Sequence, residues 1–328
     1  MRKFKAAFLT TAAHQIQYVF SPEQLQEVAE ITELRPGMAG IPEVENGSLK
    51  DVEVLFSTWG FPRLDDAQLA KMPNLKAVFY AAGATDGFAR PCFARGIKVF
   101  SAWRANGIPV AEFCLGQILL GLKGYFRTSR MFKSPDAKAR QYAGPGIYGE
   151  TVVLIGIGAV STKLKELLQA FNVKVIMIPS PEKERTMSLA EAFSIAQVVS
   201  NHLPDRDDNV GVLNGALFRS MRPGAVFINT GRGAQVDEDA LARVMAQRPD
   251  LTAILDVTDP EPPEAGSPLY RLDNVLLSAH IAGSLNDEVL RMADIMIEEY
   301  QRIQAGEAPL FRVSEEMLIT SSKPAAAV

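Results

Sequence analysis

The stretch from Thr151 to Phe171 constrains the fold of this chain more than any other part of it. The apolar, mostly β-branched residues Thr151–Ile155 are followed at once by a G-x-G pair, Gly156 and Gly158. Leucines then recur at helical spacing as far as Phe171. This order predicts a strand, a tight turn and a helix, which together begin a βαβ unit. Ordinary strand-to-helix turns share the pattern, so by itself it leaves phosphate binding open.

A glycine pair of this kind can bind a dinucleotide. Gly156 permits the turn, and Gly158 lets the backbone approach a phosphate. The N–H groups of Ala159 and Val160 at the helix start can then hold a pyrophosphate. Ser161 replaces the third glycine of the full G-x-G-x-x-G pattern. That position packs the helix against the strand, where a small serine can be tolerated.

Strand and helix patterns alternate along most of the chain. Residues 1–102 predict a small α/β unit with a parallel sheet, whose expected strands are Lys3–Thr10, Val52–Ser57, Leu75–Ala81 and Ile97–Ser101. A second series predicts a doubly wound parallel sheet, with strands at Thr151–Ile155, Val173–Ile178, Gln197–His202, Ala225–Thr230, Thr252–Val257 and Asn274–Ala279. Residues expected to cap the connecting helices are Ser188, Asn214, Asp237 and, for a last helix ending near Gln304, Ser284.

Composition narrows the classes of protein that fit. The 328 residues suffice for two domains, and 47% hydrophobic with 22% charged residues is typical of a globular chain. A net charge of −4 without a basic block argues against nucleic acid as a partner. Cys92 and Cys114 lie far apart in apolar stretches, which favours buried thiols in a reducing, cytoplasmic compartment. The three histidines are scattered, so no metal site is expected.

Two apolar segments need to be distinguished from membrane or export signals. The N-terminal apolar run is short and interrupted by Lys5, which favours a β-strand over a signal peptide. The segment Pro109–Tyr125 contains Glu112, Gln117 and Lys123, and a buried helix is expected there rather than a membrane span. The polar segment Arg127–Gly149 follows as surface or interface structure.

Three further stretches lie at predicted carboxyl ends of strands, where open α/β sheets bind ligands. Arg232, set between Gly231 and Gly233, can clamp a carboxylate, although a surface arginine in a turn has the same pattern. Asp256 can accept a hydrogen bond from an amide ligand, although a solvated acidic loop is the alternative. Asp259 fits that alternative better.

His280 ends the last expected strand and is followed by the small residues Ala282 and Gly283, which leave room for a ligand. Histidine is the usual acid/base near neutral pH. The alternative is a hydrogen-bonded core histidine. His202 also ends a strand, but it has no comparable arginine or carboxylate cluster beside it, and His14 is expected to be structural.

Taken together in this order, these stretches resemble the D-isomer-specific 2-hydroxyacid dehydrogenase family. That family combines an interrupted glycine fingerprint with the motifs H-L-P, N-T-x-R-G, D-V-x-x-x-E-P and H-I-x-G. The matching segments are Gly156–Gly158, His202–Pro204, Asn229–Gly233, Asp256–Pro262 and His280–Gly283. In the first domain, Pro73–Val78 with Ala82–Asp86 resembles the family's substrate loop, and Ala105–Glu112 its first interdomain helix.

The resemblance implies two doubly wound parallel-sheet domains and a nicotinamide cofactor, NAD(H) or NADP(H). A Rossmann-type nucleotide domain, 103–285, is expected as an insertion in a flavodoxin-like substrate domain, 1–102 plus 286–328. The residues implied in cofactor binding are Gly156, Gly158, Ala159, Val160, Pro179, Ser180, His202, Leu203, Pro204, Thr230, Gly231, Arg232, Asp256, His280, Ala282 and Gly283. A homodimer is expected through the Pro109–Tyr148 region.

The implied reaction moves hydride between the nicotinamide and a 2-oxo or 2-hydroxy acid of D configuration. His280 would exchange the proton on the substrate oxygen, Glu261 would hold the imidazole ring, and Arg232 would bind the carboxylate. Asp256 would hydrogen-bond the nicotinamide carboxamide. The residues implied in substrate binding are Trp59, Ala82, Gly83, Ala84, Asn106 and Arg232. Glu261 argues against formate, because formate-oxidising relatives carry glutamine beside the histidine.

The cofactor site departs from the usual pattern at the end of the second strand. NAD enzymes of this type carry an aspartate about 20 residues past the glycine turn, to bind the adenosine ribose. Pro179 stands there, and Ser180, Lys183 and Arg185 follow. The sequence therefore favours either acceptance of NADP(H) or an NAD site that uses backbone contacts to the ribose.

Other functions and specificities stay open on sequence alone. Trp59 either faces the substrate, which would favour an apolar or compact side chain, or packs at the domain hinge. The same fold also serves dinucleotide-sensing regulators with little or no turnover. A third alternative is an enzyme whose substrate is not a 2-oxo acid.

Overall fold

The computed structural model describes residues 2–135 and 143–321 and divides the chain into two compact units. Unit 1 contains the described residues up to Gly107 and those from Ser284 onward, and unit 2 contains Ile108–Gly283. The boundaries expected from the sequence, 102/103 and 285/286, lie a few residues from these junctions. Helix α6 (Trp103–Leu122) runs through the first junction.

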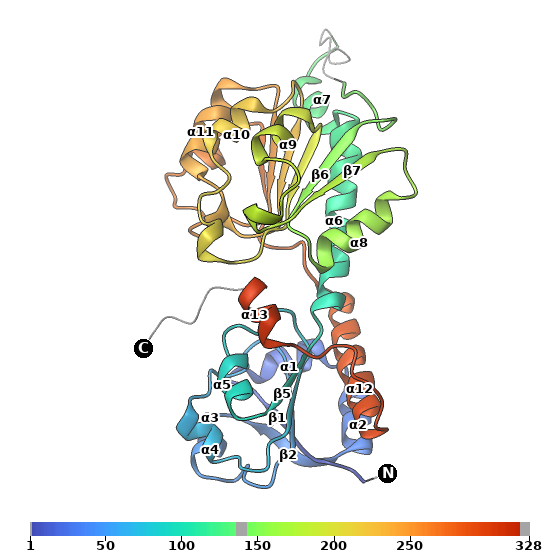
Figure 1. The fold of residues 1–328 in the computed structure, drawn as a ribbon, viewed down its shortest axis with the longest axis vertical. Helices are drawn as coiled ribbons and strands as arrows, with labels where there is room; N and C mark the ends of the chain where they lie inside the picture. The colour runs from blue at the N-terminus through green and yellow to red at the C-terminus, as the bar shows by residue number, and fades with distance from the viewer. Residues whose placement is uncertain (1, 136–142, 322–328) are drawn as a thin grey trace. The chain divides into compact units, whose positions relative to one another are not determined.

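Unit 1 is built on a parallel sheet with the strand order β2-β1-β3-β4-β5 (Figure 1). This is the flavodoxin-like order. The strands are β1 (Lys5–Leu9), β2 (Glu33–Ala39), β3 (Val54–Ser57), β4 (Ala77–Tyr80) and β5 (Lys98–Ser101). One face packs on helices α1 (Ala13–Val19), α2 (Pro22–Ile31) and α12 (Leu290–Gln304). The other packs on helices α3 (Ile41–Glu45), α4 (Asp66–Ala70), α5 (Ala89–Ala94) and α13 (Glu315–Ser321).

Strand β2 was not predicted from the sequence, because Pro36 and Gly37 interrupt it. The strand lies at the edge of the sheet, where a missing N–H is tolerated. Its pairing with β1 shifts register between Ala6 and Phe8, and Gly37 has a φ of +74°. The chain therefore accommodates the proline and glycine in an irregularity at the sheet edge.

The cap expected at Ser284 is wrong. A 3₁₀ turn, Asn286–Val289, precedes α12, whose first residue follows Val289 without a side-chain cap. Ser284 instead donates its backbone N–H to the Asn106 side chain at 3.2 Å. The helix nevertheless ends at Gln304, as predicted.

Unit 2 contains the six-stranded parallel sheet predicted from the sequence, in the order β11-β10-β9-β8-β6-β7. The strands are β6 (Thr151–Ile155), β7 (Lys174–Ile178), β8 (Val198–Asn201), β9 (Val226–Asn229), β10 (Thr252–Leu255) and β11 (Val275–Leu277). β6 pairs with β7 on one side and with β8 on the other. The direction of winding therefore reverses beside β6, which creates the crevice in which such sheets bind ligands.

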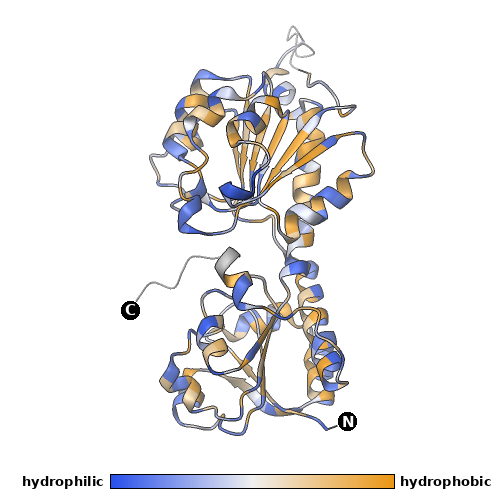
Figure 2. Ribbon diagram, in the orientation of Figure 1, coloured by the Kyte–Doolittle hydropathy of each residue, from blue (hydrophilic) through white to orange (hydrophobic). Residues whose placement is uncertain are grey.

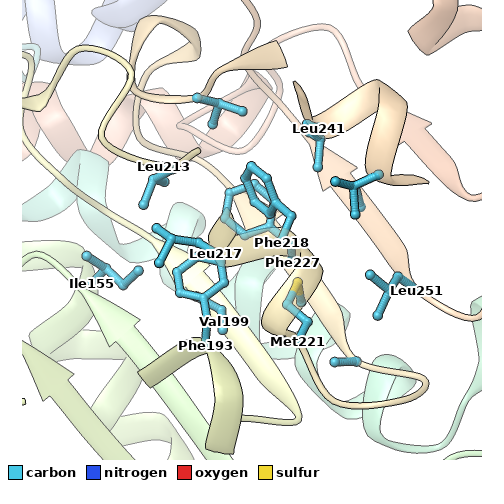
Figure 3. Packing of buried hydrophobic residues seen from close by; sticks show 14 of the residues in the cluster. Ile155, Phe193, Val199, Leu213, Leu217, Phe218, Met221, Phe227, Leu241 and Leu251 are labelled. Atoms are coloured by element: carbon cyan, nitrogen blue, oxygen red, sulfur yellow. The ribbon is translucent and has the colours of Figure 1, made fainter. Parts of the chain in front are cut away.

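Helices cover both faces of this sheet (Figure 1). Helices α9 (Leu189–Ile195), α10 (Gly215–Ser220) and α11 (Glu238–Gln247) pack on one face, where Phe193, Phe218 and Phe227 form an aromatic centre (Figure 3). Helices α6 and α8 (Ala159–Leu168) pack on the other face. The strands are strongly apolar, whereas the helices mix polar and apolar residues (Figure 2). The expected caps Ser188, Asn214 and Asp237 each accept a backbone N–H of their helix.

Helix α6 is long and apolar enough to cross a membrane by length and composition alone. It begins six residues earlier than predicted and includes Pro109. Ala111, Cys114, Ile118 and Leu122 lie on one face and are completely buried in the core of unit 2. This packing agrees with the core helix predicted from the sequence.

Candidate functional site

The turn between β6 and α8 packs directly against the loop that follows β8. Gly156 has a φ of +91°, and a Cβ there would lie 2.4 Å from the carbonyl oxygen of His202. Only glycine fits this position. A Cβ on Gly158 would meet nothing within 4 Å, so the space beside the helix start is open. Ile157, between the two glycines, is 56% exposed.

The first turn of α8 provides N–H groups that the helix itself cannot satisfy. Ala159 and Val160 are its first two residues. Ser161, in place of the third glycine, is completely buried, and its Oγ accepts the Gly158 N–H at 2.9 Å. The serine therefore fits between helix and strand and orders the turn.

Three side chains organise the end of β7. Pro179 and Ser180 follow the strand, and their carbonyl oxygens accept hydrogen bonds from Arg185 at 3.1 and 2.7 Å. The buried Asn209 donates its side-chain amide to Ser180 Oγ at 3.3 Å and to the Pro204 carbonyl at 3.0 Å. The loop after β7 is thus tied to the loop after β8, which carries the H-L-P segment.

His202 directly follows β8. Its Nδ1 lies 3.2 Å from Thr230 Oγ1, whereas its Nε2 is buried without a hydrogen-bond partner in the described part of the chain. Burial lowers the pKa of His202 to about 4, so the ring is neutral near pH 7. A buried polar nitrogen without a partner is costly unless a ligand group satisfies it.

Arg232 lies in a tightly packed turn between two glycines. A Cβ on Gly231 would lie 2.6 Å from Gln235 Oε1, and one on Gly233 would lie 1.9 Å from the Thr258 carbonyl carbon. The loop after β9 therefore contacts the loop after β10, which continues to Glu261. The Arg232 guanidinium donates to its neighbour's carbonyl at 2.8 Å, and the side chain is 45% exposed. Its Nε lies 3.8 Å from the Asp205 carboxylate, so an incoming anion would have to compete with that group.

Asp256 is buried and binds the loop that carries His280. One carboxylate oxygen accepts the Ser278 hydroxyl at 2.6 Å and the Ile281 N–H at 2.9 Å. The other accepts the Ala282 N–H at 2.9 Å. The sequence left open a ligand contact or a solvated acidic loop here, and the burial of Asp256 excludes the loop. These bonds join segments more than 20 residues apart, so no local pattern could indicate them.

His280 and Glu261 form a pair. Glu261 Oε1 lies 2.7 Å from His280 Nδ1, and both side chains are partly exposed. The bond fixes the ring and leaves Nε2 without a partner among the described residues, so that nitrogen can face a substrate. His280 is therefore not the core histidine of the alternative interpretation.

The residues proposed for substrate binding, other than Arg232, belong to unit 1. Trp59, which follows β3, stacks on Tyr18 with ring centroids 6.4 Å apart. The Ser101 hydroxyl lies 2.7 and 2.6 Å from the carbonyl oxygens of Ala82 and Gly83. Ala84 is exposed beside them, and Asn106 lies against Gly83. Ser101 and Asn106 therefore order the loop after β4, which contains Ala82, Gly83 and Ala84.

The remaining expectations concern metals and thiols. No group of His, Cys, Asp and Glu suited to a metal ion occurs among residues 2–135 and 143–321. Cys92 and Cys114 are buried free cysteines, as predicted. Burial raises the pKa of these thiols to about 12 and about 11, so both stay protonated near pH 7.

Comparison with known proteins places this arrangement in a family. Residues 115–282 match the family described as D-isomer specific 2-hydroxyacid dehydrogenase, NAD binding domain. The glyoxylate reductase of Thermofilum pendens is 28% identical over 273 residues, which cover 78% of this chain and 80% of that protein. The D-3-phosphoglycerate dehydrogenase of Archaeoglobus fulgidus is 26% identical over 74% of this chain, which spans only 48% of that longer relative.

Solved structures agree on the fold. A phosphoglycerate oxidoreductase from Rhizobium etli superimposes with a TM-score of 0.78 at 22% identity, covering 97% of this chain and all of that one. The NAD complex of a D-isomer specific 2-hydroxyacid dehydrogenase from Lactobacillus delbrueckii gives a TM-score of 0.73 at 18% identity. The superposition covers 94% of this chain and all of that one. The chain therefore belongs to the D-isomer specific 2-hydroxyacid dehydrogenase family.

Proposed function

We propose that this chain is an NAD(P)-dependent oxidoreductase that interconverts a 2-oxo acid and its D-2-hydroxy acid. The observation that carries the proposal is the 2.7 Å pair of His280 and Glu261 at the carboxyl edge of a dinucleotide-binding sheet. The loop bearing Arg232 contacts the segment leading to Glu261. An acid/base, a group that orients it and an anion clamp are what this reaction requires.

Each of these side chains has a distinct task in the proposed reaction. His280 donates the proton that the carbonyl oxygen gains on reduction, and it removes that proton in the reverse direction. Glu261 holds Nδ1, so that Nε2 faces the substrate oxygen. Arg232 binds the substrate carboxylate and polarises the adjacent carbonyl. Trp59, Ala82, Gly83, Ala84 and Asn106 of unit 1 are proposed as further substrate contacts.

A nicotinamide dinucleotide fits the residues that this structure provides. The open space beside Gly158 and the N–H groups of Ala159 and Val160 suit a pyrophosphate. Nε2 of His202, which has no hydrogen-bond partner among the described residues, and the exposed Ile157 provide a polar and an apolar contact for the dinucleotide. When bound, the cofactor supplies or accepts the hydride.

The test replaces the proposed acid/base. In a His280→Ala variant, turnover of 2-oxo acids with reduced cofactor should fall by about 100- to 10,000-fold, because proton transfer loses its donor. Cofactor affinity, measured by calorimetry, should change by less than about threefold, since the pyrophosphate contacts remain. His14→Ala, at an exposed histidine of α1, is the matched control.

The substrate panel should include glyoxylate, hydroxypyruvate, pyruvate and bulkier 2-oxo acids, each with NADH and NADPH. Turnover by the parent chain that survives in His280→Ala would contradict the assigned role. Tight cofactor binding without turnover of any acid would instead identify a dinucleotide-sensing regulator.

A further inference from the structure

We propose that the loop after β7 selects the cofactor, and that Arg185 with Ser180 binds the 2′-phosphate of NADP(H). The chain would then prefer NADP(H) to NAD(H). This inference rests on the proposed function, because it concerns the adenosine end of the same dinucleotide.

The position that recognises the NAD ribose lacks its usual carboxylate. β7 ends at the buried Ile178, and the next residue is Pro179. Proline offers neither a side-chain acceptor nor a backbone N–H to a ribose hydroxyl. A carboxylate there would also repel a phosphate. Its absence removes one determinant of NAD preference and one obstacle to NADP.

Arg185 is held over this position by the loop itself. Its Nε and Nη2 atoms donate to the carbonyl oxygens of Pro179 and Ser180, and the side chain is partly buried. A guanidinium has five N–H groups, so those not bound to the loop can donate two hydrogen bonds to one phosphate. Because the group is already ordered, it loses little conformational entropy on binding.

Asp208, the carboxylate whose pKa Arg185 influences, is already paired with another arginine. Arg206 binds both oxygens of Asp208, at 2.8 and 2.7 Å, and this pairing lowers the pKa of Asp208. Arg185 contributes only a minor part of that effect. The charge of Arg185 is therefore available to an external anion.

Ser180 supplies a second, neutral donor. Its Oγ accepts the Asn209 side-chain amide at 3.3 Å, whereas its own proton has only a long contact, 3.5 Å, to Asn209 Oδ1. That proton is free to turn toward a phosphate oxygen. Lys183 is exposed nearby, between Glu182 and Glu184, so selectivity depends on the fixed contacts more than on net charge.

The experiment is calorimetric titration of the full chain with NADPH and NADH. The parent should bind NADPH at least about tenfold more tightly than NADH. Arg185→Ala should weaken NADPH binding by about 10- to 100-fold, as expected for the loss of a charge-assisted hydrogen bond, and leave NADH within about twofold. Pro179→Asp should reverse the preference, because it restores the ribose acceptor and repels the phosphate.

Lys174→Ala is the matched control, since it removes an exposed cation from the opposite end of the same strand. Melting temperatures verify that each variant is folded. Tight NADH binding by the parent without NADPH binding would overturn the inference and leave the proposed function intact. An equal loss for both cofactors in Arg185→Ala would show that Arg185 only supports the loop. Binding of neither dinucleotide would overturn the proposed function as well.

Discussion

His280 has a backbone φ of 54°, in the left-handed region that residues with a side chain seldom adopt. Its backbone N–H donates to the Asp256 carbonyl at 3.0 Å, and the next two N–H groups bind the Asp256 carboxylate. Asp256 therefore fixes the backbone on both sides of the proposed acid/base. We therefore propose that the carboxylate acts through His280, as a positioning residue.

Asp256→Asn should lower turnover while the cofactor stays bound. An amide nitrogen cannot accept the N–H or O–H bond that a carboxylate oxygen accepts, so one buried donor in the loop loses its partner at a cost of about 1–3 kcal/mol. We expect kcat to fall by about 10- to 100-fold and its pH profile to shift as the His280–Glu261 pair moves. Calorimetry should show dinucleotide affinity within about threefold.

The control for this substitution is Asp259→Asn, which changes an exposed carboxylate of the same segment. A merely structural role for Asp256 would lower the melting temperature without altering the pH profile. Unchanged kcat in a folded Asp256→Asn variant would contradict the positioning role.

At the scale of elements, the loop after β10 is held from two sides. Gly233 lies against Thr258, and Glu238, the first residue of α11, accepts the Asp259 N–H at 2.8 Å. Glu238 is half-buried, and burial raises its pKa to about 7. The segment that leads to Glu261 thus rests on a carboxyl group that titrates near neutral pH.

The raised pKa of Glu238 predicts that the folded state becomes less stable as the pH rises. The folded state holds this proton more tightly than the unfolded state, in which the carboxyl titrates near 4.5. Its contribution to stability is therefore fully present below about pH 4.5 and is lost as the pH rises through about 7. Glu238→Gln, which stays neutral, should be more stable than the parent at pH 8 by on the order of 1 kcal/mol, a value reduced for solvent screening.

Denaturant unfolding between pH 5 and pH 8 measures this effect. The two proteins should differ little at pH 5 and diverge as the pH rises. Glu298→Gln, at an exposed glutamate of α12, should follow the parent throughout. A parent and Glu238→Gln variant with the same pH dependence would disprove the predicted coupling.

Local sequence patterns predicted the elements well where periodicity and capping residues agree. All six strands of unit 2 lie within their predicted ranges, and Asn214 and Asp237 cap their helices. Prediction failed for β2, where Pro36 and Gly37 conceal an edge strand. It also failed at Ser284, whose backbone N–H binds Asn106 far along the chain.

In the candidate site, too, local patterns predicted some features, whereas contacts between distant segments were missed. Residue types at strand ends indicated Arg232, Asp256 and His280, whereas Glu261 and its pairing with His280 follow from the resemblance. The bonds from Asp256 to the His280 loop and the support of Asp259 by Glu238 were not foreseen. They join residues distant in sequence, and only the packing of the sheet brings those residues together.

At the scale of the whole molecule, each unit has its own apolar cores on the two faces of its sheet. Unit 2 also exposes large apolar side chains near α6 and α7 (Tyr125–Met131). Those in this region are Leu120, Tyr125, Met131, Phe132 and Tyr148, which are 41–85% exposed. Such a concentration of exposed apolar groups is typical of an interaction surface, and we propose a second copy of this chain as its partner.

Light scattering coupled to gel filtration tests the proposed homodimer. The parent should elute with twice the chain mass of 35.7 kDa. A Tyr125→Asp, Phe132→Asp double variant should be monomeric, because each change places a charge in an apolar contact that would have to be desolvated. Leu310→Asp, at a comparably exposed apolar residue of unit 1, should remain dimeric. A parent that is monomeric at micromolar concentration would refute the dimer, whereas a dimer that persists in the double variant would place its interface elsewhere.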